Sequence, residues 1–323
     1  FSITPKLTLP EVDTDSESST LSVKEENGEI VVTGEKISAS FSTMTSMLKT
    51  LNIMGREVIY DNKGFEFSFF RYIENDKNST TSVYYTNPSI SYTKSNDGKT
   101  VTVTATRTGT SRCDYTLKYT FYANGIMDMD VTLAARTSDL RRLGITCSLV
   151  PGLENVEYYA RGPWENYCDR KTGSYLGIYK NTVTGFEEEY VKPQSMGNRE
   201  DVRWLAFSDE SGNGIKITTE GQVNFTALHN TDQEYVPLNH WWEIENVRRD
   251  EIILSLDYMQ RGVGNGSCNN VQTIGDYCIP YATQNFKLRF ENYGGKPDAG
   301  GYCYPEVEKS EDSYITKFEV SGA

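Results

Sequence analysis

The chain has 323 residues, of which 32 are basic and 45 are acidic, so its formal net charge is −13 at neutral pH. It is long enough for one large domain or two ordinary ones. The negative charge disfavours nucleic acid and anionic membrane surfaces as partners, because both carry the same sign. No apolar run reaches the roughly 18 residues that span a bilayer. We therefore expect a soluble protein that binds neither nucleic acid nor a membrane.

The composition favours strands over helices. The chain contains 22 Tyr and 13 Phe, with abundant Thr, Val and Ile, and these residues suit a pleated, half-buried surface. The 6 cysteines form no CxxC pair, which argues against a zinc ribbon or a redox motif. We expect mostly free thiols, as in a reducing cytoplasm, and a periplasmic location is the alternative.

In chain order, residues 1–20 contain two prolines and a polar run, which predicts the tail of a preceding domain and a linker. From Leu21 onward, short alternating runs separated by turn residues recur about every ten residues, as in antiparallel sheets. The predicted strands are Glu29–Thr33, Ser38–Ser42, Ser89–Tyr92, Val101–Thr106, Tyr115–Tyr122, Ile126–Leu133, Gly214–Thr218, Val223–Ala227, Glu251–Asp257 and Asn285–Phe290.

A tight hairpin is predicted at Asn124-Gly125, because this pair supplies the positive φ that such a turn needs. Residues 294–323 read as a C-terminal extension with one final strand at Tyr314–Val320. Long loops on a rigid β scaffold are where binding sites usually lie. The predicted long loops are Arg71–Thr81, Tyr159–Gly177, Tyr190–Arg203, Asn230–Asn246 and Gln260–Asp276.

Self-contained catalytic chemistry has little support in the sequence. The two histidines, His229 and His240, have no metal-ligand spacing, and no GxSxG elbow is present. Glycoside hydrolysis needs two carboxylates about 5 to 10 Å apart. The spacing of Glu74, Asp76 and the run Glu187–Glu189 does not place any two of them across a sugar. We therefore predict no catalytic residue and no metal site in this chain.

The glycine-rich segment Gly262–Cys268 is not followed by a helical pattern, so it is not a dinucleotide loop. It predicts a sharply folded loop that approaches another segment or a ligand. The densest cluster of chemistry is Tyr158–Arg170, where aromatic rings, carboxylates, guanidinium groups and an amide occur together. These groups could contact the C–H faces and hydroxyls of a sugar, or hold the loop in an Arg/Asp network. Both alternatives remain open.

This cluster resembles the C-terminal domain of the multidomain β-galactosidases of glycoside hydrolase family 2, whose pattern there is close to R-G-P-x-E-N-Y-x-D-R. The segment Tyr190–Trp204 is similar to a second block, Y-V-x-P-Q-E-x-G-N-R-x-D-V-R-W, with Ser195 in place of the usual Glu. Arg71–Asp76, Leu143-Gly144 and Gln260–Gly264 are similar to further family segments. The first pattern is matched by Arg161, Gly162, Pro163, Glu165, Asn166, Tyr167, Asp169 and Arg170.

The resemblance implies a large antiparallel β-supersandwich similar to galactose mutarotase, which we place at residues 21–293. In the family, both catalytic carboxylates and the active-site Mg and Na belong to a TIM barrel earlier in the polypeptide. This sequence lacks the alternating strand and helix pattern of such a barrel. The implied partners are the other domains of a parent β-galactosidase, β-galactosides and further copies of the parent in a homo-oligomer, and no cofactor is expected in this chain.

The resemblance also suggests substrate-binding candidates. In many members the Gly-rich loop ends in a Trp that stacks on the substrate, and Cys268 is nearest that position. In some members the segment after the N-D motif is a mobile loop, here Lys77 to Thr81. The candidates are Asn265, Ser267, Cys268, Asn75, Asp76, Lys77, Arg161, Trp164, Glu165, Asn166, Asp169 and Arg170.

The function implied is that of an accessory domain of a retaining β-galactosidase that hydrolyses terminal, lactose-like β-D-galactosides. The domain would shape the substrate entrance and the oligomer, without catalysing the reaction itself. A free-standing aldose epimerase is one alternative, with His229 or His240 as its acid. A non-catalytic carbohydrate-binding module is the other.

Overall fold

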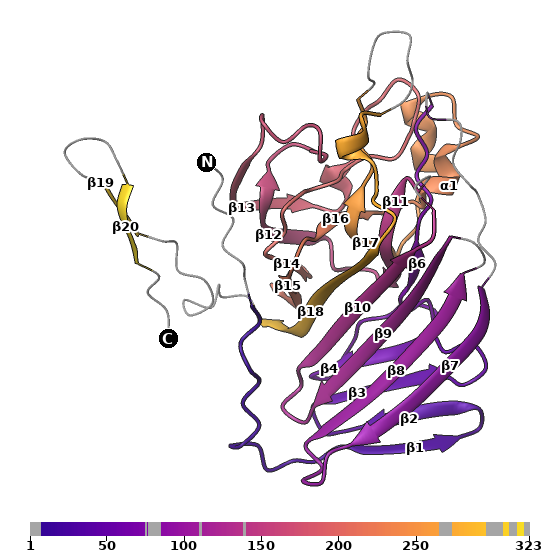
Figure 1. Ribbon diagram of the computed structural model, residues 1–323, viewed down its shortest axis with the longest axis vertical. Helices are drawn as coiled ribbons and strands as arrows, with labels where there is room; N and C mark the ends of the chain where they lie inside the picture. Colours follow the sequence, from indigo (N-terminus) through magenta and orange to yellow (C-terminus); the bar gives the residue numbers. More distant parts are fainter. Residues whose placement is uncertain are drawn as a thin grey trace.

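The computed structural model describes residues 8–74, 76, 85–109, 112–137, 140–264, 273–294, 306–309 and 315–319. In these ranges the chain is built almost entirely of antiparallel β-sheet, with one four-residue α-helix, α1 (Asp232–Tyr235), and short 3-10 turns (Figure 1). The predicted all-β, antiparallel supersandwich is confirmed. The domain boundaries at residues 20 and 293 stay a prediction.

Three sheets make up the body, and each follows a simple antiparallel order. The first has the order β1-β2-β3-β4-β5, the second β13-β12-β14-β15-β18-β10-β9-β8-β7 and the third β16-β17-β11-β6. A separate pair joins β19 to β20. The strands are β1 Ser22–Glu26, β2 Glu29–Thr33, β3 Ile37–Ser42, β4 Leu48–Ile53, β5 Arg56–Glu57, β6 Glu66–Ser68, β7 Tyr85–Lys94, β8 Thr100–Gly109, β9 Cys113–Tyr122, β10 Met127–Ala135, β11 Arg142–Leu149, β12 Asn155–Gly162, β13 Tyr175–Thr182, β14 Trp204–Ser208, β15 Asn213–Glu220, β16 Asn224–Leu228, β17 Ile252–Gln260, β18 Thr283–Gly294, β19 Glu306–Lys309 and β20 Ile315–Glu319.

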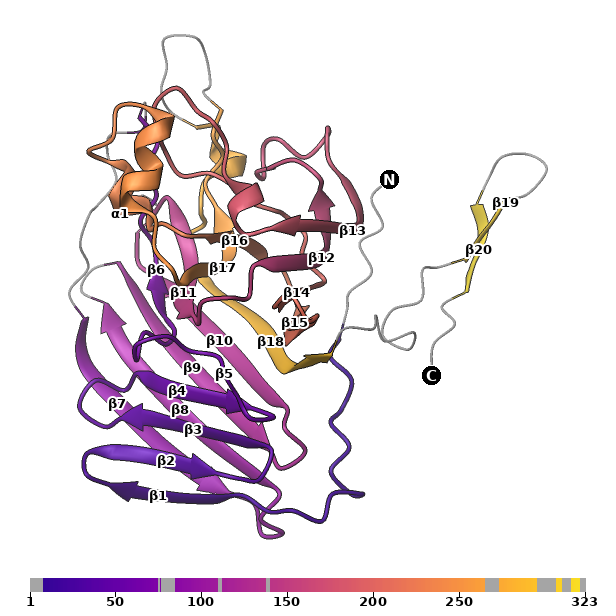
Figure 2. The same ribbon diagram turned by 180° about the vertical axis from the view of Figure 1, so that it is seen from behind.

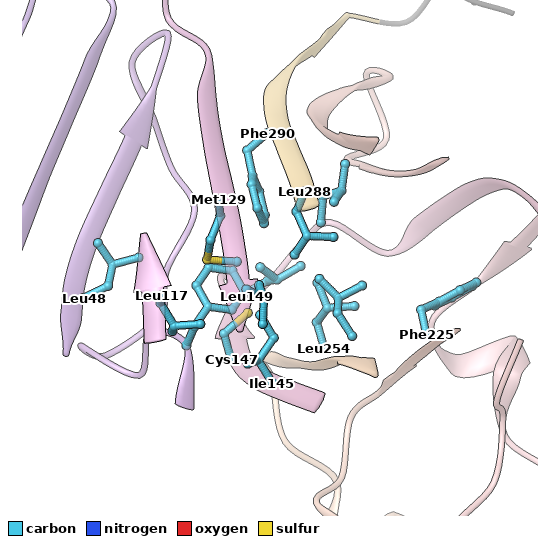
Figure 3. Packing of buried hydrophobic residues seen from close by; sticks show 14 of the residues in the cluster. Leu48, Leu117, Met129, Ile145, Cys147, Leu149, Phe225, Leu254, Leu288 and Phe290 are labelled. Atoms are coloured by element: carbon cyan, nitrogen blue, oxygen red, sulfur yellow. The ribbon is translucent and has the colours of Figure 1, made fainter. Parts of the chain in front are cut away.

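The five-stranded sheet packs on one half of the nine-stranded sheet. Every second residue of β9 and β10 is buried, so each strand presents one apolar face. The ring of Phe41 on β3 meets Tyr119 on β9 edge-on, with 5.0 Å between centroids. Figure 3 shows Leu48, Leu117 and Met129 in the layer where these sheets meet. Burial of these alternating faces holds the two sheets together.

The four-stranded sheet packs on the other half of the nine-stranded sheet. Phe225 on β16 meets Tyr158 on β12, with 5.4 Å between ring centroids. The long strand β18 joins the two halves, because it pairs with β10 over Thr283–Phe290 and with β15 over Lys287–Gly294 (Figure 2). Leu288 and Phe290 of β18 therefore lie beside the labelled core residues of both halves in Figure 3. The loops at one end of this second half carry the site described below.

The predicted strands all occur, with shifts of a few residues at their ends, and the Asn124-Gly125 turn joins β9 to β10. Two predicted loops are corrected. The predicted loop Tyr159–Gly177 begins in β12 and ends in β13, and the predicted loop Asn230–Asn246 contains α1 and the 3-10 helix η2 (Trp241–Val247). The strands that were not predicted are β1, β4, β5, β6, β11, β12, β13, β14 and β19. β14 is a short apolar run that is buried on nearly every residue, which periodicity does not distinguish from other buried segments. In β11 every second residue from Leu143 to Leu149 is apolar, so its alternation was present in the sequence and was overlooked.

Two further features of the fold concern membrane-spanning helices and cysteines. Within the described ranges, no helix is long and apolar enough to cross a membrane. The four cysteines in those ranges, Cys113, Cys147, Cys168 and Cys278, are free thiols, as predicted for most cysteines of the chain.

The close approach of β11 to β17 gives a test of the fold. The register shifts at Leu143/Gly144, and a Cβ on Gly144 would lie 2.1 Å from Asp257 Oδ1 and 2.5 Å from Asp257 Cα. Gly144→Ala should therefore overpack the sheet and lower the free energy of unfolding by about 1 to 3 kcal/mol. Urea unfolding followed by circular dichroism measures this.

Gly173→Ala is the matched control, because no heavy atom lies within 4 Å of its added Cβ. It should leave the urea midpoint unchanged. Equal midpoints for the two variants would contradict the packing described for Gly144.

Candidate functional site

The candidate site is a group of loops at the end of the second half of the sandwich. β12 ends at Gly162, and the chain turns through a cis Gly162-Pro163 peptide bond into Trp164–Arg170. This loop lies against residues 197–203, which precede β14, and against residues 260–264, which follow β17. Three segments that the sequence separates by up to about a hundred residues are therefore held together by hydrogen bonds.

Asn166 is fully buried and binds two of these segments through its side chain. Its Nδ2 donates to the carbonyl oxygens of Arg161 and Trp164, at 3.1 and 2.9 Å, and its Oδ1 accepts from the Glu200 backbone N–H at 2.9 Å. Asn198 Nδ2 donates to the Asn166 carbonyl at 2.7 Å. The amide side chain thus closes the turn and pins it to the neighbouring loop.

Glu165 is 3% exposed, and its carboxylate accepts hydrogen bonds from several neutral donors. Oε2 accepts from the Gly197 N–H at 2.9 Å and from the Tyr167 hydroxyl at 3.3 Å, while Oε1 accepts from the Tyr190 hydroxyl. Arg170 lies 3.6 Å from the same carboxylate with its side chain largely exposed. Burial and the neighbouring Glu165 carboxylate raise the pKa of Tyr190 and keep its hydroxyl a donor.

A second charged group lies beside this turn. Arg161 donates from Nε to Asp201, and Lys171 Nζ lies 3.0 Å from both Glu200 Oε2 and Asp201 Oδ1. Burial raises the pKa of Glu200 to about 7, although Lys171 opposes this. Burial also raises the pKa of Asp201, but Lys171 and Arg161 outweigh it, so the net pKa of Asp201 is lowered. The pKa values of these two adjacent acids are therefore shifted in opposite directions.

The loop after β17 is held by Asp169. Asp169 Oδ2 accepts from the Gly264 N–H at 2.7 Å, and a Cβ on Gly262 would lie 2.5 Å from that oxygen. Glycine at position 262 permits this approach, as predicted for a loop that comes close to another segment. Cys168 Sγ adds a contact at 3.3 Å to the Gln260 carbonyl oxygen.

Asp76 lies in a third group, formed with arginines of other segments. Arg141 Nε is 2.6 Å from Asp76 Oδ2, and Arg71 Nη2 is 3.7 Å from the same oxygen. Arg71 is 1% exposed and donates to the carbonyl oxygens of Arg261 and Gly262. This arginine joins the R-x-x-x-x-D segment to the loop that Asp169 holds.

The structure thus places the predicted residues in different surroundings. Arg161, Glu165, Asn166 and Asp169 lie in one hydrogen-bonded group, and Asp76 is joined to it through Arg71. Trp164 is 69% exposed, and Arg170 is also exposed. Their contact with substrate stays a prediction. Asn75, Lys77, Asn265, Ser267 and Cys268 lie outside the described residues.

Three residues of this group were not among the candidates. Asn198 is fully buried, and it donates to Glu200 at 3.2 Å and accepts from Gln260 Nε2 at 2.9 Å. Asn198 and Glu200 belong to the second family block, and Gln260 begins the Gln260–Gly264 segment, so those patterns were the available signal.

The two histidines lie in different environments. His229 is 9% exposed, with Nε2 2.9 Å from Glu154 Oε2 and Nδ1 3.2 Å from the Glu251 carbonyl oxygen. His240 stacks on Trp242, with 4.4 Å between ring centroids. Across the part of the chain that the structure describes, no group of three or more His, Cys, Asp or Glu is arranged to hold a metal ion.

Comparison with known proteins identifies the family. Residues 33–291 match the profile of the family described as "Beta galactosidase small chain". The chain belongs to this family. The family resemblance of the Arg161–Arg170 and Tyr190–Trp204 segments is thereby confirmed.

Curated relatives are named β-galactosidases. The β-galactosidase of Priestia megaterium is 29% identical over 174 residues, which is 53% of this chain and 16% of the relative. That of Streptococcus thermophilus is 26% identical over 264 residues, 76% of this chain and 25% of the relative. The chain therefore spans only about a sixth to a quarter of these relatives.

Solved structures of low identity also align with the chain. A galactose mutarotase related enzyme from Lactobacillus acidophilus is 6% identical with a TM-score of 0.45, covering 83% of this chain and 98% of that one. A galactose 1-epimerase from the same species is 8% identical with a TM-score of 0.43, covering 85% and 99%.

The buried turn gives a stability test. Asn166→Ala removes three side-chain hydrogen bonds. It leaves the carbonyl oxygens of Arg161 and Trp164, whose bonds are partly buried, and the buried N–H of Glu200 without these partners. We expect a loss of about 2 to 4 kcal/mol in the free energy of unfolding. Urea unfolding measures it. Trp164→Ala, at an exposed position of the same turn, should change stability by less than about 0.5 kcal/mol. A larger loss in Trp164→Ala than in Asn166→Ala would contradict this assignment.

The opposite pKa shifts of Glu200 and Asp201 give a pH test. Glu200 has a raised pKa, so its contribution to stability is present below about pH 4.5 and is lost as the pH rises toward about 7. Relative to Glu200→Gln, the wild type should lose stability across that window. Asp201 has a lowered pKa, so its contribution is present above about pH 4 and is lost as the pH falls.

Asp201→Asn is therefore the matched control, because its pH dependence should have the opposite sign. The wild type should lose stability relative to Asp201→Asn as the pH falls. Urea midpoints from pH 3.5 to 8 measure both differences. The same sign of pH dependence for the two variants would contradict the shifts.

Proposed function

We propose that this chain is the C-terminal accessory domain of a retaining β-galactosidase that hydrolyses terminal, lactose-like β-D-galactosides. The observation that carries the proposal is the family match over residues 33–291, together with the small share of each relative that the chain spans. The other domains of the parent are then the partners of this chain. Mg and Na, where the parent uses them, are held in its catalytic barrel.

The loop group supports a role at the substrate entrance. Arg71, Asn166 and Asp169 hold the segments 161–170, 197–203 and 260–264 in fixed positions. A site assembled between domains needs such a fixed rim, because substrate-positioning groups must be held within a fraction of an ångström. Trp164 is the exposed aromatic side chain on this rim, and it is suited to cover a sugar face.

The chain itself is proposed to be non-catalytic. Glu165 accepts hydrogen bonds from neutral donors in the loop, and Glu200 is paired with Lys171. Both are therefore engaged in holding segments together, whereas hydrolysis needs two carboxylates on either side of a glycosidic bond.

The direct test is hydrolysis of p-nitrophenyl β-D-galactoside. We expect the 323-residue chain to release no nitrophenol and a polypeptide that also carries the family's barrel to release it. Turnover by the chain alone, lost in Glu165→Gln or Glu74→Gln, would contradict the non-catalytic role. No turnover by the longer polypeptide would contradict the galactosidase assignment.

A second assay separates the epimerase alternative. Polarimetry of freshly dissolved α-D-galactose should show the same mutarotation rate with and without the chain. Acceleration that disappears in His229→Asn or His240→Asn would establish the epimerase instead.

A further inference from the structure

A cavity of about 590 Å³ lies on the four-stranded sheet, apart from the loop group described above. Its size falls within the range of small-molecule sites. Its lining comes from β6, β11, β16 and β17, from the segment before β6 and from the start of α1. Figure 1 shows these strands side by side beneath α1.

The strand register places one row of polar side chains across the cavity floor. Thr226 on β16 is opposite Ser255 on β17, Ser255 is opposite Thr146 on β11, and Thr146 is opposite Glu66 on β6. Directly opposed residues share a face of the sheet, so three hydroxyls and a carboxylate form a continuous line. The next row adds Ser148. A sheet face that carries hydroxyls rather than apolar groups is suited to a ligand with many hydroxyls.

The cationic side chains of the cavity are neutralised within the protein. Arg142 Nη1 lies 2.7 Å from Asp232 Oδ2, and its Nη2 donates to Thr226 Oγ1 at 3.1 Å. Arg249 and Lys63 lie 3.1 and 3.4 Å from Glu251. Because these charges are already paired, the cavity favours a neutral ligand over a phosphate or a carboxylate.

Glu66 and Asn230 are among the cavity groups that can still accept a hydrogen bond. Glu66 is an exposed residue that makes no ion pair among the described residues. Partial desolvation of its carboxyl group raises its pKa, although the charge of Arg107 opposes this. Asn230 is 2% exposed, and its Nδ2 donates to the Val247 carbonyl at 2.7 Å, while its Oδ1 has no hydrogen-bond partner in the described ranges. Half-buried Phe69 and buried Phe70 add an apolar side to the cavity.

We propose that this cavity is a binding site for a neutral saccharide of one or two rings, held by the Thr226–Ser255–Thr146–Glu66 row and by Phe69. Glu66 accepts hydrogen bonds from sugar hydroxyls. Thr146 Oγ1 donates to the Leu254 carbonyl oxygen at 3.1 Å and Ser255 Oγ donates to Thr146 Oγ1 at 3.2 Å, so these floor hydroxyls face a sugar as acceptors. Phe69 covers a C–H face. The site needs no catalytic domain, so it stands or falls independently of the galactosidase assignment.

The test is isothermal titration of the 323-residue chain at pH 7.5 with methyl β-D-galactopyranoside, lactose and inorganic phosphate. We expect saturable binding of at least one saccharide and none of phosphate. Glu66→Gln should weaken binding about tenfold, because a charged acceptor makes a stronger hydrogen bond than an amide. Ser148→Leu, which adds bulk to the floor, should abolish it. Lys180→Ala, with a side chain 78% exposed on β13, is the matched control and should leave it unchanged.

Circular dichroism melting checks that each variant is folded, and Glu66→Gln keeps the test valid should Ser148→Leu fail to fold. A flat titration of the folded wild type with both saccharides would overturn the proposal. Binding unaffected by Glu66→Gln and Ser148→Leu, or abolished by Trp164→Ala instead, would place the sugar elsewhere and also overturn it. Tight phosphate binding would show that the cavity is an anion site.

Discussion

The arrangement of loops in this protein depends on the satisfaction of buried amide and carboxylate groups. Asn198 is fully buried and contacts three parts of the chain, through the Asn166 carbonyl, the Glu200 carboxylate and the Gln260 amide. A buried polar group without partners costs about 1 to 3 kcal/mol, so these segments must reach one another in a single register. The sheets supply the stability, and the amide contacts select the loop geometry.

Two buried acids also influence the geometry of the structure more than its stability. Glu200 and Asp257 both have pKa values raised by burial to about 7, and each lies beside a cation, Lys171 and Arg142. Buried ion pairs contribute little net stability, because desolvation offsets much of the attraction. Their effect here is geometric, since each ion pair reinforces a contact that backbone hydrogen bonds also make: Arg142 and Asp257 lie on the paired strands β11 and β17, and the Arg161 N–H donates to the Glu200 carbonyl oxygen at 2.9 Å.

Alternation and turn residues in the sequence located part of the fold. β9 and β10 alternate along their whole length, so periodicity alone located them. β11 and β12 were missed although both carry the alternation, because their flanking turns and the neighbouring polar cluster were read as loop. The family pattern located Glu165 and Asn166, but spacing could not show that their side chains are occupied by Gly197 and Glu200. Contacts between distant segments depend on the assembled fold.

The loop group and the cavity share one hydrogen-bonded unit. Gln260 donates to Asn198 in the loop group and to Asp257 on the same strand, β17, at 2.9 and 3.2 Å. Asp257 is paired with Arg142, which in turn holds Thr226 and Asp232 in the cavity wall. The cavity wall and the rim loops are thus held by one continuous set of hydrogen bonds and ion pairs, and removing Arg142 would leave the buried carboxyl group of Asp257 without this cation.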